Sequence, residues 1–288
     1  MDQHHERTTV VQPREALKNI IYIQTQILEV PVTVAHLFFN FLIYDFKDAV
    51  INMFSGKSFN PAQDIPSLAG KVILVTGGNT GLGKQTILYL SQHSPARVYL
   101  AARTASKAQS AIADIKKVVP DAPIEHLPLD LTSFASIKSA AETFRAKEQR
   151  LDLLINNAGV MATPPSQTTE GYENQFGTNH MGHALFTKLL MPILLATAEQ
   201  PDSDVRIVNL TSMGHILAPS GGLIFDQEAL GKKSTWARYG QSKLSNILFT
   251  RELAQRYPQI TSVSIHPGVI LTDLYASVMT NFFMRIAI

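Results

Sequence analysis

The sequence predicts a protein of the α/β class, with a doubly wound, mostly parallel sheet between two layers of helices, a three-layer α/β/α arrangement. Three observations lead to this prediction. From residue 70 onward, short apolar runs alternate with stretches of helical periodicity, and the connections are short. The runs are apolar on both faces, which is typical of parallel strands covered by helices on each side. The first run ends in a glycine cluster, Thr76–Gly83, before a helical pattern begins.

The individual elements follow from the same patterns. Strands are predicted over Val72–Val75, Arg97–Ala101, Ile124–Leu129, Leu151–Ile155, Arg206–Leu210 and Thr261–Ile265. Helices are predicted over Lys84–Ser91, Ser106–Val119, Ser133–Gln149, Tyr172–Ala198 and Trp236–Arg256. Pro120 ends the second of these helices, and Thr132 or Ser133 caps the third.

Length and composition exclude several classes of function. With 288 residues, the chain has room for one large α/β domain and an extension, and its 45% hydrophobic content is enough for a sizeable core. The formal net charge is +2 and no basic stripe is present, so we expect no nucleic-acid partner. The chain has no cysteine, which removes disulfides, thiol nucleophiles and cysteine-ligated metals. We expect no metal site.

The domain organisation is predicted as an extension, residues 1–66, followed by a dinucleotide-binding catalytic domain, residues 67–288. The extension begins with a polar segment that does not resemble a secretory signal, and it ends in a linker rich in proline and glycine. Between them, residues 20–54 carry apolar residues at spacings of three and four, which indicates a helix kinked at Pro31.

The apolar helix of residues 20–54 has three interpretations. Its run from Ile27 to Tyr44 is at the lower limit of one bilayer crossing, but Glu29, His36 and Asn40 interrupt it. It could be an interfacial or hairpin membrane anchor, a helix packed on the domain or on a second subunit, or a spanning helix. A membrane-associated location, at the endoplasmic reticulum or a lipid droplet, is favoured over the cytoplasm, and a homodimer remains open.

The glycine cluster forms a strand–turn–helix unit that is suited to binding a phosphate. Glycines let the backbone approach an anion closely, and the N-terminus of the following helix supplies free N–H groups. The residues expected to contact a nucleotide cofactor here are Gly77, Asn79, Thr80, Gly81, Leu82 and Gly83. Lys84 would add positive charge, although an exposed first-turn lysine is the alternative. An ordinary strand–helix turn is the alternative, and the other parts of a nucleotide site decide between the two interpretations.

The ends of the second and third strands indicate which nucleotide is bound. Arg103 follows the second strand, with no acid nearby. An acid there would bind the adenosine ribose, whereas an arginine accommodates a 2′-phosphate, so Arg103 favours NADP(H) over NAD(H). A solvated surface arginine is the alternative. Asp130 and Leu131 follow the third strand, where Asp130 could accept from the adenine amino group or could instead cap a helix.

Further polar residues follow the later strands. The segment Asn157, Ala158 and Gly159 follows the fourth strand, and its small residues would let the end of that strand lie against the cofactor ribose. Tyr239 and Lys243 lie four residues apart on one helix face. A phenol with a pKa of about 10 is a poor acid–base group at neutral pH, and a neighbouring ammonium favours its ionised form.

These motifs together resemble the short-chain dehydrogenase/reductase family, in its single-domain, Rossmann-fold type. Thr76–Gly83 matches the family's Thr-Gly-x-x-x-Gly-x-Gly, Asn156–Gly159 its Asn-Asn-Ala-Gly, and Tyr239 to Lys243 its Tyr-x-x-x-Lys. The segment from His266 to Thr272 matches its Pro-Gly segment, and the resemblance covers about Leu68 to Leu274. Details of the motifs are similar to retinol-dehydrogenase-like and fungal members.

The resemblance implies a role for each catalytic residue. Tyr239 would be the general acid/base, and Lys243 would hold the cofactor ribose and lower the pKa of Tyr239. Ser212 would hydrogen-bond the substrate oxygen, with Thr211 as its competitor by position. Asn179 would support a water relay behind Lys243.

The resemblance also implies cofactor contacts on the nicotinamide side. The residues in this group are Pro267, Gly268, Val269, Ile270 and Thr272, and Tyr239 and Lys243 would contact the cofactor as well. His180 and His183, by contrast, are interpreted as packing or helix-face residues. The predicted function is an NADP(H)-dependent oxidoreductase that interconverts a hydrophobic alcohol and its aldehyde or ketone. The apolar loop Gly214–Thr235, together with Trp236, would border this lipophilic substrate. The alternative is a catalytically impaired nucleotide-binding scaffold or regulatory protein of the same fold.

The C-terminus departs from the family pattern. Family members continue past the sixth strand with a substrate-covering helix and a seventh strand, whereas only an apolar segment, Asp273–Ile288, remains here. If the sheet lacks the seventh strand, the sixth strand becomes an exposed edge with unpaired backbone groups. There are two interpretations. The chain could be a truncated gene product with a poorly covered active site, or the apolar N-terminal helix could cover the place of the missing elements.

Overall fold

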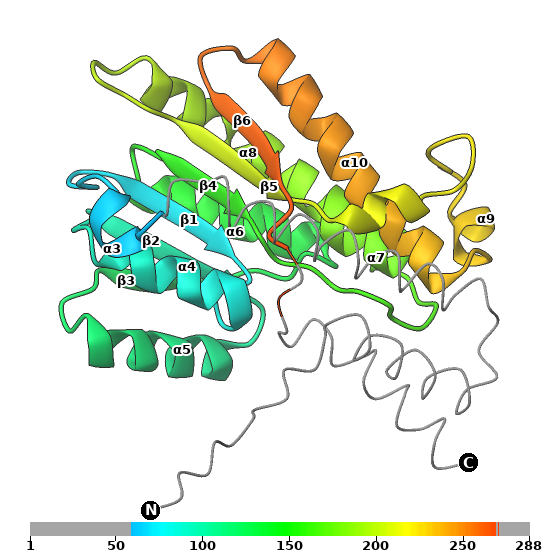
Figure 1. Ribbon diagram of the computed structural model, residues 1–288, viewed down its shortest axis with the longest axis horizontal. Coiled ribbons are helices and arrows are strands. Elements are labelled where there is room, and N and C mark those ends of the chain that lie inside the picture. The colour runs from blue at the N-terminus through cyan, green and yellow to red at the C-terminus, as the bar shows by residue number, and fades with distance from the viewer. Residues whose placement is uncertain (1–58, 269, 271–288) are drawn as a thin grey trace, which may run out of the picture. The chain divides into compact units, whose positions relative to one another are not determined.

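A computed structural model of the protein describes residues 59–268 and residue 270 (Figure 1). A six-stranded sheet forms its centre, with strand order β3-β2-β1-β4-β5-β6 and every neighbouring pair parallel. The strands are β1 (Val72–Thr76), β2 (Arg97–Ala102), β3 (Ile124–Pro128), β4 (Leu153–Asn156), β5 (Arg206–Leu210) and β6 (Thr261–Ile265). The predicted doubly wound sheet is confirmed.

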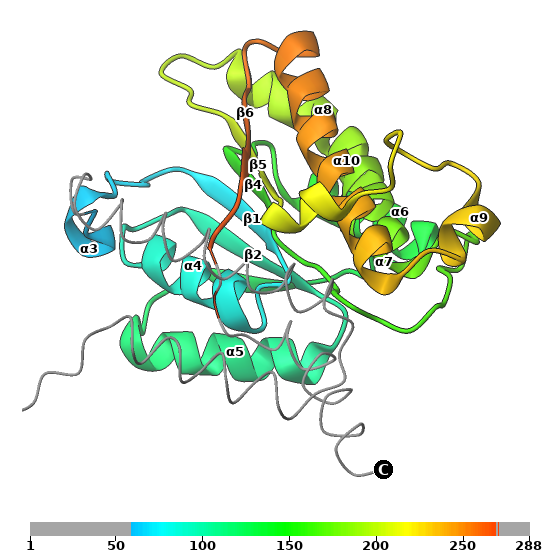
Figure 2. The same ribbon diagram turned by 45° about the vertical axis from the view of Figure 1, so that its right-hand side comes forward.

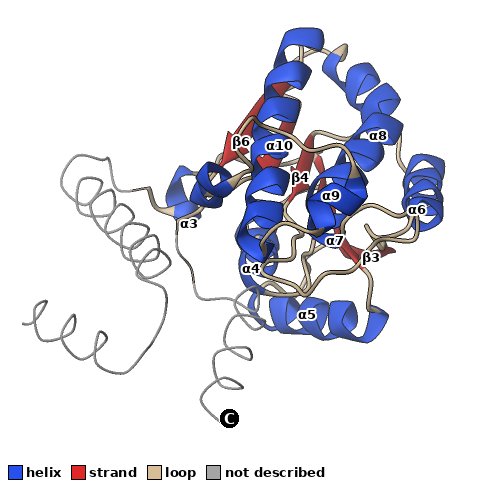
Figure 3. Ribbon diagram, turned by 90° about the vertical axis from the view of Figure 1, so that its right-hand side faces the viewer, coloured by secondary structure: helices blue, strands red, loops and turns tan. Residues whose placement is uncertain are grey.

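Helices cover both faces of this sheet, so the predicted three layers are confirmed (Figures 2 and 3). The larger helices are α4 (Gly81–Ser91), α5 (Ala105–Val118), α6 (Phe134–Lys147), α8 (Gly182–Ala198) and α10 (Thr235–Arg256). Helices α4 and α5 lie on one face, and α6, α8 and α10 lie on the other. The short helices are α3 (Pro61–Asp64), α7 (Asn174–Phe176) and α9 (Gln227–Gly231).

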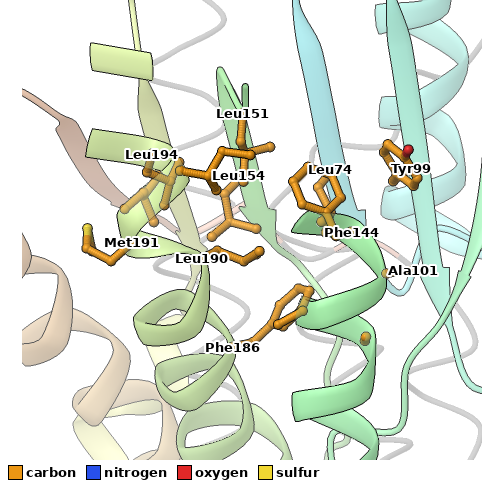
Figure 4. Close-up of a cluster of buried hydrophobic side chains, with 14 of the residues drawn as sticks. Leu74, Tyr99, Ala101, Phe144, Leu151, Leu154, Phe186, Leu190, Met191 and Leu194 are labelled. Carbon is orange, nitrogen blue, oxygen red and sulfur yellow. The ribbon is translucent and has the colours of Figure 1, made fainter. Parts of the chain in front are cut away.

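The core has two halves because successive residues of a strand point to opposite faces. In β1, Leu74 packs toward Phe144 of α6 and Phe186 of α8, together with Leu154 of β4 (Figure 4). Its neighbour Ile73 packs on the other face, in the cluster that includes side chains of α4 and α5. Both β1 side chains are fully buried, which explains why the strand is apolar without alternation.

The strand order reverses between β2 and β4, which lie on either side of β1. Chain segments that follow β1 and β4 therefore leave the sheet in different directions and open a crevice at the carboxyl ends of these strands. This is where doubly wound folds bind ligands. The glycine turn after β1 and Asn157–Gly159 after β4 meet at this point.

The predicted helix Tyr172–Ala198 is divided into three parts. After α7 comes a π-helical segment, η1 (Gly177–Met181), in which the N–H of Gly182 donates to Gly177 O, and then α8 begins. Close packing constrains this segment, since a Cβ on Gly177 would lie 2.3 Å from Thr168 Cγ2, and one on Gly182 would lie 2.6 Å from Leu131 O. The sequence predicts one continuous helix because the spacing of apolar residues does not reveal an extra residue within one helical turn.

Smaller differences concern element ends and loops. The fourth strand begins at Leu153 rather than Leu151, because the Leu151 N–H donates to Thr197 Oγ1 of α8 instead of the sheet. Ser133 is the cap of α6, and its hydroxyl accepts from the Ser136 N–H. The predicted linker contains α3, and the loop after β5 contains a 3₁₀ helix, η2 (Met213–Leu217).

Two features of the structure concern the predicted membrane helix and the predicted exposed edge of the sheet. The stretch Asn174–Ala198 is long and apolar enough to cross a membrane by composition, but half of its most apolar window is buried inside the protein. We assign it to the core, where Phe186 and Leu190 are fully buried. Within the part of the chain that the structure describes, β6 pairs with β5 alone. The predicted apolar helix of residues 20–54 and the question of a seventh strand both concern residues outside the described ones.

Candidate active site

The glycine turn brings the chain back very closely on itself. Gly77 has a φ of +66°, a left-handed conformation that side chains disfavour. A Cβ on Gly83 would lie 2.4 Å from Gly77 O and 2.6 Å from Asn157 Nδ2, so this position has no room for any side chain. Thr80 is the extended N-cap residue of α4, and Asn79, Gly81 and Leu82 belong to the same turn. The free N–H groups of an 11-residue helix therefore open onto the crevice.

Thr76 ties this turn to the end of β4. Its Oγ1 accepts from the backbone N–H groups of Asn157, at 2.9 Å, and Ala158, at 3.0 Å. The Asn157 amide in turn donates to Thr76 O at 2.8 Å. The predicted phosphate turn and the predicted ribose segment thus form one rigid unit. This cradle fits a dinucleotide, because the glycine turn after β1 and the small residues Ala158 and Gly159 after β4 lie at the same crevice.

Arg103 lies exposed directly after β2, at the same edge of the sheet. Among the described residues, no hydrogen bond or ion pair holds its guanidinium, which leaves its five N–H donors available to a phosphate.

Lys84 has a different environment from the predicted one. Its Nζ lies 2.8 Å from Asp114 Oδ2 of α5. The hydrogen bonds from Lys117 and from Lys84 lower the pKa of Asp114 to about 2. A phosphate role for Lys84 would have to compete with this ion pair, and it remains a prediction.

Asp130 and Leu131 follow β3 in a tight turn. Asp130 Oδ1 accepts from Thr132 N at 2.9 Å and from Thr132 Oγ1 at 2.7 Å, which stabilises the turn and leaves the second carboxylate oxygen for a ligand. Leu131 is buried and packs against Gly182. Asp130 is not the cap of the next helix, since Ser133 has that role.

The two candidates for the substrate-binding hydroxyl are in different environments. Thr211 Oγ1 donates to Lys243 O at 2.9 Å, which ties the end of β5 to α10. Ser212 Oγ instead accepts from Gly214 N at 3.0 Å and lies beside Tyr239. A Cβ on Gly214 would be 2.8 Å from Tyr239 Cε1 and 3.4 Å from Ser212 Oγ. The geometry favours Ser212, because its hydroxyl and the tyrosine ring flank one glycine.

Tyr239 and Lys243 are both buried on α10. The ammonium of Lys243 lies 5.6 Å from the centre of the Tyr239 ring and donates to Leu210 O at 3.1 Å. Desolvation by burial lowers the pKa of Lys243 to about 8. A cation this close favours the phenolate form of tyrosine over the phenol.

Asn179 lies in the π-helical segment and is fully buried. Its side-chain amide accepts from Val160 N and donates to Val160 O and to Ser242 Oγ, at 2.8, 2.9 and 2.9 Å. Both of its N–H donors are therefore used, so a water relay through Asn179 would have to involve its backbone carbonyl. A Cβ on Gly159 would be 3.3 Å from Asn179 Oδ1 and 3.7 Å from Lys243 Nζ, which places the three residues together.

The predicted nicotinamide-side residues are only partly described. Pro267 and Gly268 follow β6, with Gly268 at a φ of +85°, and Ile270 is exposed. Val269 and Thr272 lie outside the described residues.

Sequence reasoning missed the polar network around the site. A buried ion pair joins Arg238 Nη1 of α10 to Glu173 Oε1 at 2.6 Å. Gln241 exchanges two hydrogen bonds with the backbone of Ile224 and so holds the loop before α9. His183, interpreted as a packing residue, is hydrogen-bonded through both ring nitrogens. The partners of Arg238 and Gln241 are remote in sequence, so local spacing carries no signal for them.

Comparisons with known proteins show which family the sequence matches. A sequence model of the family described as short chain dehydrogenase matches residues 71–281. An uncharacterized oxidoreductase of Schizosaccharomyces pombe is 47% identical over 217 residues, which cover 74% of this chain and 64% of the yeast protein. Retinol dehydrogenase 12 of Mus musculus is 40% identical over 238 residues, which cover 81% of this chain and 71% of the mouse protein. This chain therefore spans less than two thirds of the yeast relative.

One solved structure extends the comparison to a cofactor complex. The Pseudomonas aeruginosa RhlG/NADP active-site complex matches with a TM-score of 0.58 and 26% sequence identity. The match covers 74% of this chain and 78% of that one.

Proposed function

This chain belongs to the short-chain dehydrogenase/reductase family, and from that premise we propose that it is an NADP(H)-dependent oxidoreductase that interconverts a hydrophobic alcohol and its aldehyde or ketone. The observation that carries the proposal is the buried cluster of Tyr239, Lys243 and Ser212 at the carboxyl end of β5. A nicotinamide cofactor, when bound, supplies or accepts the hydride.

The residues of the chain divide the remaining work. In the reducing direction, Ser212 donates a hydrogen bond to the carbonyl oxygen, and Tyr239 transfers its phenolic proton to that oxygen as the alkoxide forms. The Lys243 ammonium stabilises the resulting phenolate, since its Nζ lies 5.6 Å from the ring centre. In the oxidising direction, the phenolate accepts the proton of the alcohol. Asn179 keeps Ser242 and the segment after β4 in place around this pair.

The choice of NADP(H) rests on Arg103. Its exposed guanidinium, without a partner among the described residues and with no acid beside it in the sequence, suits a 2′-phosphate. The NADP complex of the Pseudomonas aeruginosa relative supports the same choice.

A lipophilic substrate is supported by the residues next to Tyr239. Met161, Ala162 and Trp236 pack against it, and the neighbouring loops expose Ile216 at 59% and Phe225 at 75%. Apolar and aromatic side chains predominate in the lining of sites for lipophilic ligands. Relatives named retinol dehydrogenases support a hydrophobic alcohol as substrate.

The experiment is steady-state reduction of a lipophilic aldehyde and ketone panel, retinal included, with NADPH and with NADH. We expect kcat/KM to favour NADPH in the wild type. Arg103→Glu should lower the ratio of NADPH to NADH efficiency by about 100-fold, because it replaces a charge-assisted contact with repulsion. Arg145→Glu, an equal charge change on an exposed residue of α6, is the matched control and should leave the ratio unchanged. A wild-type preference for NADH would overturn the cofactor assignment.

Two further outcomes have their own tests. NADPH binding without turnover across the whole panel would favour the alternative of a nucleotide-binding scaffold. We also propose that residues 20–54 attach the chain to a membrane or lipid surface, on the basis of their apolar helical pattern. Flotation with liposomes, with and without residues 1–57, tests this attachment, and failure of the full chain to float would end the idea.

A further inference from the structure

His183 is a buried, titratable side chain for which the proposed reaction gives no role. It lies in the first turn of α8 and is 2% exposed. Its Nδ1 is 3.0 Å from the backbone carbonyl oxygen of Asn179, and its Nε2 is 2.8 Å from Thr76 Oγ1. One imidazole therefore touches both the end of β1, where the glycine turn starts, and the backbone of a predicted catalytic residue.

The direction of both hydrogen bonds follows from the partners. A carbonyl oxygen only accepts, so Nδ1 must carry the proton and donate to Asn179 O. Nε2 is then the acceptor in the neutral ring, and the Thr76 hydroxyl donates to it. Burial agrees with a neutral imidazole, because desolvation lowers the pKa of His183 to about 4.

The Thr76 hydroxyl is at the same time the acceptor for two backbone N–H groups, those of Asn157 and Ala158. A continuous chain of hydrogen bonds thus runs from these N–H groups through Thr76 and His183 to Asn179 O. Every donor and acceptor in it has one consistent direction. The two backbone turns that build the cofactor cradle are connected in this way to the residue behind Lys243.

The π-helical segment explains why such a connection is needed. Asn179 lies within Gly177–Met181, where the backbone holds one residue more per turn than an α-helix. Relaxation to a regular α-helical register would rotate Asn179 by about 100° around the helix axis. Its side chain would then leave Val160 and Ser242. A hydrogen bond from the side chain of His183 to Asn179 O opposes this relaxation from the first turn of α8.

We propose that His183 is a positioning residue, which holds the carbonyl and side chain of Asn179 in their working orientation and couples them to the cofactor turn through Thr76. The inference rests on the proposed oxidoreductase function for its kinetic consequence, but the hydrogen-bond coupling itself does not require turnover. The two hydrogen bonds of His183 run to Thr76 and to Asn179, so we expect it to act on the reaction through Asn179.

Two substitutions separate the two hydrogen bonds. In His183→Asn, the amide nitrogen takes the place of Nδ1 and keeps the donor to Asn179 O, while the bond to Thr76 is lost. In His183→Gln, the amide reaches the place of Nε2 and keeps the contact with Thr76, while the donor to Asn179 O is lost. His93→Gln is the matched control, because His93 bonds Pro61 O by one ring nitrogen at 2.8 Å, far from the catalytic cluster in sequence and fold.

The kinetic arm measures kcat and KM for NADPH and a lipophilic ketone. We expect His183→Gln to lower kcat by about tenfold or more, with the KM for the ketone within about threefold of the wild type, because small misplacements act on the chemical step. His183→Asn should recover most of kcat, and His93→Gln should equal the wild type. If the two His183 variants lose kcat equally, or in proportion to their loss of thermal stability, His183 is a packing residue and the proposal is overturned.

The second arm is amide hydrogen exchange without cofactor or substrate. In His183→Gln, amides of residues 178–184 should exchange about tenfold faster relative to those of α5, whereas His183→Asn should keep its protection. Equal protection in both variants would refute the coupling. If the wild type shows no turnover, the proposed function fails, and this arm still decides the role of His183.

Discussion

The buried ion pair between Arg238 and Glu173 provides a prediction whose size follows from the structure. Their side chains are 2% and 1% exposed, and Nη1 lies 2.6 Å from Oε1. Arg238 Nη2 also donates to Thr163 O, and Glu173 Oε2 accepts from Phe176 N at the start of α7. The pair therefore joins the segment after β4, the start of α7 and the first turn of α10, directly beside Tyr239.

We predict strong coupling between these two residues. Arg238→Met leaves the Glu173 carboxylate buried without its cation, which should cost about 3–5 kcal/mol of unfolding free energy. Glu173→Gln leaves the guanidinium buried without its anion and should cost a similar amount. The double variant removes both charges, and the amide oxygen that Glu173→Gln introduces can still accept from Phe176 N. Its cost should therefore be smaller than the sum of the single costs, by about 2–3 kcal/mol.

Urea unfolding of the full chain, followed by circular dichroism, measures all four free energies of this cycle. A single loss of about 3–5 kcal/mol is a large part of the roughly 5–15 kcal/mol typical of a folded domain, so it will be well resolved. Additive losses in the double variant would refute the reasoning, because they would mean that water or other groups already neutralise each charge separately. Single losses below about 1 kcal/mol would refute it as well, since that is the value of an exposed pair.

Three further predictions concern the turn, the lysine and the loop. Gly83→Ala should weaken NADPH binding about 100-fold in a fluorescence titration, because the added Cβ would lie 2.4 Å from Gly77 O. Gly231→Ala is the control and should bind NADPH normally, because no atom lies within 4 Å of its added Cβ. Burial lowers the pKa of Lys243 from 10.5 to about 8. Between pH 8 and pH 10.5 the unfolded chain therefore binds more protons than the folded chain, so the free energy of unfolding should rise with pH over this range. In the wild type this rise should reach up to about 3 kcal/mol between about pH 7 and about pH 10, as measured by urea unfolding, and Lys243→Met should lack it. Gln241→Leu should raise the KM for a lipophilic ketone about tenfold with little change in kcat, because it frees the loop at Ile224; an unchanged KM would show that this loop does not border the substrate.

The layered sheet could be predicted because its signals are local. Strands such as Val72–Thr76 are buried on both faces and so read as continuous apolar runs, and glycine is required where the turn meets Asn157. The grouping of the candidate catalytic residues was predictable for a related reason. Each of them lies at the carboxyl end of a strand or near the start of a helix, and parallel strands bring such ends together.

The remaining features depend on contacts between distant residues. The π-helical segment around Asn179 leaves the apolar spacing of its helix unchanged, so the sequence shows an uninterrupted helix there. The partners Arg238 and Glu173 lie 65 residues apart, and Thr76 and His183 lie 107 apart. The ion pair of Lys84 with Asp114 of the next helix is a further contact that local spacing does not show, and the phosphate role of Lys84 stays a prediction.

The central claim is that Tyr239 transfers a proton while hydride moves between NADP(H) and a lipophilic carbonyl. The most direct measurement uses NADPH that carries deuterium at both C4 positions of the nicotinamide, together with a lipophilic ketone, and follows deuterium in the alcohol product by mass spectrometry. We predict that the wild type places deuterium on the carbinol carbon, and that Tyr239→Phe binds NADPH but lowers the rate of deuterium transfer about 100-fold or more. Absence of deuterium in the wild-type product, or equal rates in the two proteins, would contradict the account.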